Sequence, residues 1–277
     1  MHCGTSLLDL SSPQVMGILN VTPDSFSDGG RFVDHSQALR QAQQMIDEGA
    51  TIIDIGGEST RPGATPVAED EEIQRVIPII KALRAVSDVI ISIDTSKPAV
   101  MRAAVDAGAN FINDVQALRE AGAIETAAEL AVPVCLMHAQ GKPTVMQDNP
   151  KYQHVVHEVR DFLQERIELC VKKGIATDQL CIDPGFGFGK RVRHNLRLLK
   201  SLSTLVELGL PVLVGVSRKS IVGKLLDIPV EERLAGSLAL TAISVWQGAK
   251  IIRTHDVQAT VHAVKMSHYV QQVEDSD

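Results

Sequence analysis

The sequence contains few aromatic residues, since Phe, Trp and Tyr together make up 3% of its 277 residues. Its hydrophobic fraction is nevertheless 44%, so Ile, Val, Leu and Ala must fill the core. Such a composition suits parallel strands that are buried on both faces and read as continuous aliphatic runs. A chain of this length favours one large α/β barrel, and we therefore expect a single domain over residues 1–277 rather than two small domains.

Clustered positive charge is also missing. The formal net charge is −7 at pH 7, and the chain has neither a basic stripe nor a basic segment rich in aromatic residues. This composition argues against a nucleic-acid partner. Anionic small molecules are compatible with it, because a local group of Arg and Lys side chains can bind phosphate within an acidic protein.

Signals for export or membrane insertion are absent from the sequence. The N-terminus has no basic segment followed by an apolar one, and the longest uncharged apolar stretch, residues 234–249, is shorter than the ~20 residues that a membrane span needs. The four cysteines show no C-x-x-C spacing, and we interpret them as reduced thiols. The sequence therefore predicts a cytoplasmic protein that does not associate with membranes.

What the chain does contain is a repeating pattern of strands and helices. Eight apolar, strand-like runs occupy residues 15–19, 52–55, 89–93, 111–112, 134–137, 180–182, 212–216 and 251–252. Helix-like segments alternate with them at residues 36–48, 69–86, 97–107, 121–130, 152–173, 195–208, 231–247 and 257–270. Eight β-α units of ~35 residues each predict a (β/α)8 TIM barrel. A short extra pair of strands near residues 6–10 is expected to precede it.

Polar residues follow most of these runs, at the point where each strand ends. In a barrel the C-terminal ends of the strands gather at one face, where enzymes of this fold have their active sites. Asp94, Asn113 and Asp183 end three of the runs, and their carboxylate and amide groups suit a flat heterocycle that has an amino group beside a ring N–H. The alternative is that a residue here caps the next helix, which fits Thr95 or Ser96 better than Asp94.

The last two strand ends carry a different set of groups. Ser217 and Lys219 are two residues apart, as are Arg253 and His255, so each pair points to the same side. The corresponding loops commonly form the phosphate site of this fold, and these groups are suited to an oxyanion. The alternative interpretation is a surface salt-bridge cluster.

Three further features are open to interpretation. The Gly-rich segment at residues 185–190 lacks nucleotide-binding spacing, and we expect a flexible loop whose aromatic rings stack on a ligand. Asn20 offers one neutral oxygen, which binds a hard cation poorly alone but suffices for Mg²⁺ shared with substrate phosphates. Asp54 and Glu58 flank Gly-Gly, and we expect them to orient a loop backbone.

Seven motifs spread over nearly the whole chain resemble, in order, those of the dihydropteroate synthases, a family of pterin-binding enzymes. They lie at residues 15–30 (VMGILNVTPDSFSDGG), 53–63 (IDIGGESTRPG), 92–97 (SIDTSK), 112–114 (IND), 183–190 (DPGFGFGK), 216–220 (VSRKS) and 252–256 (IRTHD). The resemblance implies a transferase of folate biosynthesis that joins 6-hydroxymethyl-7,8-dihydropterin diphosphate to 4-aminobenzoate, giving 7,8-dihydropteroate and diphosphate. It also implies Mg²⁺ as cofactor and a homodimer formed through helices on the far side of the barrel.

The resemblance further implies roles for individual residues. The pterin ring would lie in a slot formed by Asp94, Asn113, Val115, Met137, Asp183, Gly215 and Lys219. Arg253 would stack on the ring and, with His255, Asn20 and Arg61, hold the diphosphate and Mg²⁺. The aminobenzoate would sit near Thr60, Pro62, Phe188, Ser217 and Lys219, with Phe26, Asp28 and Arg61 closing over it. The catalytic set would be Asp28, Arg61, Asp94 and Lys219.

Three alternatives remain at this point. A corrinoid-dependent methyltransferase also binds a pterin in a barrel, but its substrate has no diphosphate to hold. A non-catalytic pterin-binding paralogue would be expected to lose Asn20, Arg61, Lys219 or His255, all of which are present. A phosphate-binding lyase or isomerase barrel is the third, because the fold alone does not define a function.

Overall fold

The computed structural model describes residues 1–22, 31–59, 64–141 and 150–273. Five residues with predicted roles lie outside these ranges, namely Phe26, Asp28, Thr60, Arg61 and Pro62.

Eight parallel strands form the barrel, as the sequence predicted. Their order in the sheet is β8-β7-β6-β5-β4-β3-β10-β9. The two edges then meet, because Ile182 of β8 forms a parallel bridge with Val212, and the Ile182 amide donates to the Pro211 carbonyl at 3.0 Å. The strands are β3 (Gln14–Asn20), β4 (Ile52–Gly56), β5 (Ile90–Asp94), β6 (Phe111–Asp114), β7 (Val134–Met137), β8 (Leu180–Asp183), β9 (Leu213–Gly215) and β10 (Ile251–Thr254).

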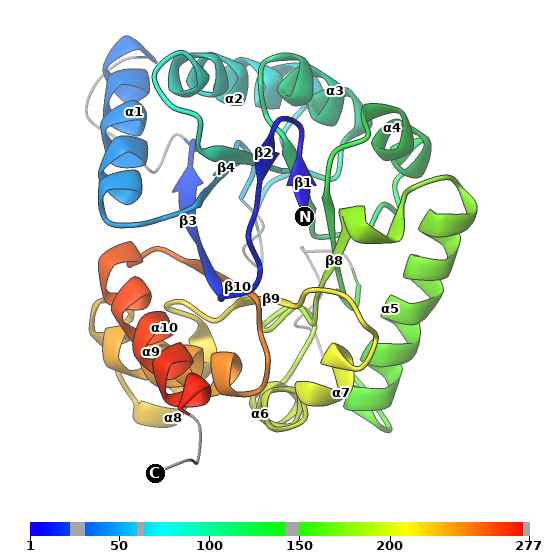
Figure 1. Ribbon diagram of the computed structural model, residues 1–277, viewed down its shortest axis with the longest axis vertical. Coiled ribbons are helices and arrows are strands. Elements are labelled where there is room, and N and C mark those ends of the chain that lie inside the picture. Colours follow the sequence, from blue (N-terminus) through cyan, green and yellow to red (C-terminus); the bar gives the residue numbers. More distant parts are fainter. Residues whose placement is uncertain (23–30, 60–63, 142–149, 274–277) are drawn as a thin grey trace.

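Helices surround the barrel, and α1 to α5 follow one another around it in sequence order (Figure 1). They are α1 (Arg31–Asp47), α2 (Glu69–Arg84), α3 (Pro98–Asp106), α4 (Ala123–Leu130), α5 (Val155–Lys172), α6 (Val192–Lys200), α7 (Ser203–Val206), α8 (Ser220–Leu226), α9 (Leu234–Trp246) and α10 (Val257–Gln272). None of the helices within the described ranges is long and apolar enough to cross a membrane.

Two helices differ from the sequence-based expectation. The single helix predicted over residues 195–208 is divided into α6 and α7, because the chain leaves helical geometry at Ser201 and buries both Leu202 and Leu205 after the turn. The short helix α8 was not predicted. Its seven residues span too few turns for a helical period to stand out from the apolar run before it.

The N-terminal hairpin closes one end of the barrel, which confirms the expected pair of short strands. Strands β1 (His2–Cys3) and β2 (Ser6–Leu7) pair antiparallel and lie across the centre of the barrel in Figure 1. The Asn110 side chain donates to the Cys3 carbonyl at 3.1 Å and ties the hairpin to the barrel. The apolar cluster beneath it consists of Cys3, Leu8, Met16, Ile52, Ile90, Phe111, Cys135, Cys181, Leu213 and Ile251.

Strand alternation places polar side chains at the opposite end of the same interior. Residues two apart on a strand point to the same side, so each cluster member that lies on a barrel strand is followed by a second inward-facing residue nearer the C-terminal end. The residues between them pack against the helices in the outer core, as Ile53, Ile112, Ile182 and Ile252 do. The inward pairs are Ile52 and Asp54, Phe111 and Asn113, Cys181 and Asp183, and Ile251 and Arg253.

Candidate active site

A cavity opens at the C-terminal end of the strands. It is lined by Asp94, Asn113, Val115, Met137, Asp183, Phe188, Gly215, Lys219 and Arg253. All nine are among the substrate-binding residues predicted from the sequence, and the fold brings them together from six strands or the loops that directly follow them. Residues that are up to 159 positions apart therefore share one small polar space.

Arg253 lines this cavity and joins two buried carboxylates. Its Nε donates to Asp54 Oδ2 at 2.6 Å, and its Nη2 donates to Asp94 Oδ2 at 2.7 Å. The Asn113 amide also donates to Asp54 Oδ2, at 3.0 Å. The expectation that Asp54 orients a loop backbone is therefore wrong, since Asp54 holds two side chains of the site. Its spacing of two from the inward-facing Ile52 was the signal that would have revealed this.

Asp94, which lines this space, has an acceptor atom without a donor in the described part of the chain. Its Oδ1 atom is buried and has no hydrogen-bond partner among the described residues. Burial raises the pKa of Asp94 to about 7, although Arg253 opposes the shift. A buried acceptor without a donor is costly, so a ligand that brings an N–H group to Asp94 would be favoured.

Asp94 does not cap the helix that follows it. The Thr95 hydroxyl oxygen accepts from the Lys97 amide at 3.3 Å, which forms a local turn, and the Ser96 hydroxyl bonds Asp114. Lys97 is the N-cap residue of α3 and no described side chain caps this helix, so the capping alternative is wrong for Thr95 and Ser96 as well, and Asp94 lines the cavity.

Lys219 and Asp183 occupy the other side of the cavity. Lys219 Nζ donates to the Phe186 carbonyl and lies 4.7 Å from the centroid of the Phe188 ring. Burial lowers the pKa of Lys219 to about 8, with Asp183 opposing the shift. Burial likewise raises the pKa of Asp183, and here Lys219 opposes the shift. Each charge thus lowers the free-energy cost of burying the other, although the two groups form no direct bond. Both remain available to a ligand that lies between them.

Ser217 and His255 form a pair beside the cavity rather than in its lining. The Ser217 hydroxyl lies 3.1 Å from His255 Nδ1 and accepts from the His255 amide at 3.2 Å. Arg218 points elsewhere and bonds the carboxylate of Asp256. The salt-bridge alternative thus describes Arg218 and Asp256, whereas Ser217 and His255 present a hydroxyl and an imidazole near Lys219.

Asn20 is the last residue of β3, at the end of the barrel where the cavity opens. It pairs in register with Gly56 of β4, which in turn pairs with Asp94 of β5. Within the described residues no group of three or more His, Cys, Asp or Glu side chains is arranged to hold a metal ion by itself. A cation here would have to take most of its ligands from a bound molecule and water.

The Gly-rich segment at residues 185–190 forms more hydrogen bonds than the predicted flexible loop would have. The Gly185 amide donates to Asp183 Oδ1 at 2.6 Å, and the Gly187 amide donates to Asn195 Oδ1 at 2.8 Å. The Tyr152 hydroxyl donates to the Gly189 carbonyl at 2.9 Å. A loop bonded at alternate residues to buried side chains does not support the predicted flexible loop, although Phe188 does line the cavity as expected.

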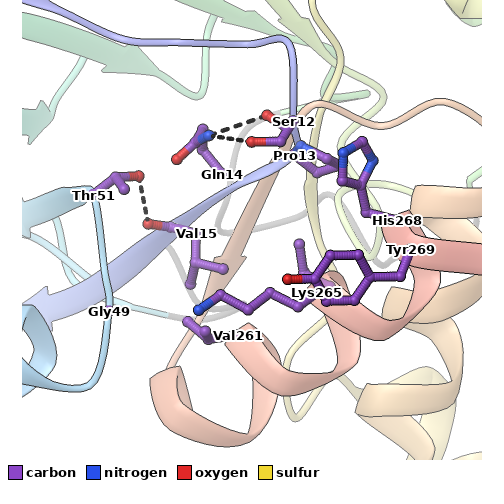
Figure 2. Close-up of a pocket in the computed structure, with 11 residues that line it drawn as sticks. Ser12, Pro13, Gln14, Val15, Gly49, Thr51, Val261, Lys265, His268 and Tyr269 are labelled. Carbon is purple, nitrogen blue, oxygen red and sulfur yellow. Dashed lines mark hydrogen bonds between the residues drawn. The ribbon is translucent and has the colours of Figure 1, made fainter. Parts of the chain in front are cut away.

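A second cavity lies at the opposite end of the barrel. Its volume is about 390 Å³, and it opens between α10 and the segments that precede β3 and β4. Figure 2 shows Lys265, His268 and Tyr269 of α10 facing Ser12–Val15 across it. No strand C-terminus reaches this cavity, so we do not assign the chemistry to it.

Comparison with known proteins agrees with this geometry. The sequence pattern of the pterin binding enzyme family matches residues 16–255. The dihydropteroate synthase of Haemophilus influenzae is 53% identical over 266 residues, covering 96% of this chain and 97% of that protein. The Escherichia coli dihydropteroate synthase is 55% identical over 263 residues, covering 95% of this chain and 93% of that protein.

Solved structures extend the likeness to three dimensions. The Yersinia pestis dihydropteroate synthase, solved as a sulfonamide drug complex, superposes with a TM-score of 0.94 at 52% identity, covering 99% of both chains. The Xanthomonas albilineans dihydropteroate synthase in complex with 7,8-dihydropteroate gives a TM-score of 0.90 at 47% identity and 98% coverage of both chains.

The barrel, the polar strand ends and these matches define one class of protein: the chain belongs to the pterin-binding enzyme family. The activity that goes with this similarity is that of a dihydropteroate synthase, a transferase of folate biosynthesis.

Proposed function

We propose that the cavity binds the pterin ring and that its walls guide the condensation with 4-aminobenzoate. The observation that carries this proposal is the unpartnered Asp94 Oδ1, which lies in the same cavity as Asn113 and Asp183. A pterin carries hydrogen-bond donors, namely its 2-amino group and its ring N–H groups, that match the acceptor oxygens of these three side chains. Met137 and Val115 supply the apolar surfaces between which a flat ring fits.

The residues around the ring suit the charge that develops during the reaction. As the C–O bond to diphosphate breaks, positive charge builds on the pterin methylene, and the new C–N bond forms there. Fixed carboxylates at Asp94 and Asp183 stabilise that charge in a buried site. The arylamine is neutral at pH 7 and is already nucleophilic, so the site needs no strong general base; its proton leaves to diphosphate or water.

The leaving group needs positive charge on its other side. Arg253 and the Ser217–His255 pair are placed to bind diphosphate, and Arg61 is proposed to join them. Asn20 fits a shared Mg²⁺ because its neutral oxygen stands in register with Asp94 and leaves the remaining coordination sites to diphosphate and water. Bound Mg²⁺ would supply the charge that stabilises departing diphosphate.

A binding experiment tests this arrangement of the metal. With one protein ligand, Mg²⁺ should bind weakly to the free protein and much more tightly once pyrophosphate is present. Calorimetric titration of Mg²⁺ with and without pyrophosphate measures the difference, and Asn20→Ala should reduce it. Equally tight Mg²⁺ binding in both titrations would contradict a shared site.

The second substrate is proposed to lie beside Lys219. Phe188, Ser217 and Lys219 provide an aromatic face, a hydroxyl and a cation, which suit a ring that bears a carboxylate. Thr60, Pro62, Phe26 and Asp28 are proposed to complete this region. A Xanthomonas albilineans relative, 51% identical with a TM-score of 0.91, was solved with 4-aminobenzoic acid, which supports the choice of substrate.

The decisive experiment is incubation with the pterin diphosphate, Mg²⁺ and labelled aminobenzoate. We expect labelled 7,8-dihydropteroate to form and a sulfonamide to compete with aminobenzoate. Pterin binding without any product would instead indicate a non-catalytic paralogue, and methyl transfer from a reduced folate would indicate a methyltransferase.

The assembly is proposed to be a homodimer through α9 and α10. These helices lie side by side in Figure 1 and carry large apolar side chains that are exposed in the single chain. Trp246 is 60% exposed and Met266 is 62% exposed, while Ile243, Tyr269 and Val270 extend the same surface. Trp246→Glu should convert a dimer to a monomer in sedimentation velocity, whereas Leu7→Glu, at a residue of β2 that is 64% exposed, should not.

We place the reaction in the cytoplasm, as the sequence predicted. All four cysteines are buried and free, which fits a reducing compartment. Cell fractionation with an antibody against the chain tests this location.

A further inference from the structure

The Gly-rich loop lies directly against the chain that follows β7, with little room between the two backbones. A Cβ added at Gly185 would stand 1.9 Å from the His138 carbonyl oxygen, and one added at Gly189 would stand 2.4 Å from that of Gln140. Both glycines have positive φ, +66° and +61°, which residues with side chains rarely adopt. Close packing of this kind leaves backbone carbonyls buried, and they need donors.

Lys190 supplies those donors. Its side chain is 3% exposed, and its Nζ donates to the carbonyl oxygens of His138 at 3.2 Å, Gly185 at 2.9 Å and Phe188 at 3.0 Å. His138 Nδ1 lies 2.8 Å from the same nitrogen. An amine this deeply buried is costly unless such partners compensate it. Lys190 therefore joins the end of β7 to both halves of the loop through one atom.

Both protonation states of Lys190 keep most of these bonds. An ammonium has three N–H donors for the three carbonyls, whereas a neutral amine has two, so one carbonyl loses its donor while the lone pair accepts from His138 Nδ1–H. Burial lowers the pKa of Lys190 well below its ordinary value, and burial followed by the charge of Lys190 lowers the pKa of His138 to about 2. His138 is thus neutral at pH 7 and adds no second charge to the cluster.

The loop that Lys190 fixes also determines the position of Lys219. The Phe186 carbonyl accepts from Lys219 Nζ, and the Phe188 ring lies against the same nitrogen. Phe186 and Phe188 stand between the Gly185 and Gly189 peptides whose geometry Lys190 and Tyr152 set. A shift of the loop would therefore move both contacts of the Lys219 amine.

We propose that Lys190 is a positioning residue for the condensation, because it fixes the Gly-rich loop so that Phe186 and Phe188 hold Lys219 where the two substrates meet. This inference rests on the proposed function. Lys190 itself touches neither substrate. Of the proposed pterin contacts, Asp94 and Asn113 stand on other strands, whereas Asp183 and Lys219 adjoin the loop.

The test compares Lys190→Met with the unaltered protein. Met keeps the apolar length of the side chain and removes every donor. We expect the KM for aminobenzoate to rise at least tenfold, while the Kd of a pterin analogue measured by calorimetry rises less, because Asp94 and Asn113 keep their positions. The alkaline limb of the kcat/KM profile should also move to higher pH, since Lys219 gains solvent when the loop relaxes.

Two further variants separate positioning from general damage. Leu83→Ala removes a fully buried side chain of α2, remote in sequence from the loop, and should lower thermal stability without changing either substrate constant. Tyr152→Phe removes a single hydroxyl donor from the same loop and should raise the aminobenzoate KM two- to fivefold in a well-folded protein.

The outcomes distinguish this inference from the proposed function. If the unaltered protein makes no dihydropteroate, the proposed function fails. If it is active and Lys190→Met behaves kinetically like Leu83→Ala, the positioning role is overturned. If Lys190→Met is not recovered in folded form, Tyr152→Phe decides, and an unchanged aminobenzoate KM overturns the proposal.

Discussion

The two ends of the barrel interior are built from the same strands but from opposite kinds of side chain. The closed end holds Phe111, Cys181 and Ile251 in an apolar cluster beneath the N-terminal hairpin. The open end holds Asn113, Asp183 and Arg253, each two residues further along the same strands. Two residues of strand span only ~6.6 Å. Within that distance the interior changes from apolar groups, whose burial stabilises the folded state, to polar and charged groups, whose burial destabilises it.

This difference indicates a division of labour. The closed end contributes stability, whereas the open end carries buried charges whose cost is only partly compensated, as the raised pKa of Asp94 and the lowered pKa of Lys219 indicate. Substitutions at the two ends should therefore have separable effects on stability and on ligand binding.

The largest effect is expected from Arg253→Met. The change leaves Asp54 and Asp94 buried without their common cation, and removing one partner of a buried ion pair costs about 3–5 kcal/mol. It also removes a proposed contact with diphosphate, so we expect turnover to fall at least 1000-fold. Dihydropteroate formation and denaturant unfolding measure the two effects. Normal pterin affinity in this variant would contradict the assignment of ligand binding to the open end of the barrel.

Phe111→Ala tests the closed end. Truncating a fully buried aromatic side chain costs about 3–5 kcal/mol of unfolding free energy. Because Phe111 does not reach the open cavity, the folded variant should keep its KM values and its kcat at low temperature. A changed KM for either substrate would show that the two ends are coupled.

Asp183→Asn should weaken the pterin site with a smaller loss. An amide places a donor where the ring also donates, and loss of a hydrogen bond to a charged group costs about 1.5–3 kcal/mol, or roughly 10- to 150-fold in affinity. Aminobenzoate handling should change less. Calorimetry with a pterin analogue provides the measurement, and unchanged affinity would remove Asp183 from the ring site.

Lys219→Met should stabilise the protein while abolishing activity. The folded pKa of about 8 lies below the ordinary 10.5, so the buried ammonium destabilises the folded state fully below pH 8. Between pH 8 and 10.5 the unfolded state binds more protons, and the stability of the unaltered protein rises with pH. We expect the variant to gain about 2 kcal/mol at pH 7 and the difference to shrink above pH 8. A gain that grows with pH would contradict this sign.

The smallest effect is expected from Lys265→Ala in the cavity at the closed end. Lys265 is exposed and lies far from the strand C-termini, so stability should change by less than about 0.5 kcal/mol. Dihydropteroate synthesis should be unchanged. A clear loss of activity would show that this cavity contributes to catalysis.

The barrel and much of its open cavity follow from the sequence pattern. Aliphatic runs at regular spacing predict eight parallel strands, and that architecture brings their C-terminal ends together, so the pattern predicts that Asp94, Asn113 and Asp183 share one site. The roles of residues 23–30 and 60–63 remain predictions, because these segments lie outside the described ranges.

Tertiary contacts, by contrast, define which side chains pair within that site. The sequence predicts that Asp54 orients a loop backbone beside Gly-Gly, whereas its partner Arg253 is 199 residues away. Lys190 belongs to a segment predicted to be flexible, although His138, one of its partners, lies 52 residues earlier on another strand end. The local order of apolar and polar residues predicts whether a segment is a helix or a strand and which of its faces is buried. Pairing depends on which elements the closed barrel makes neighbours, and burial then makes those contacts matter because water no longer competes for them.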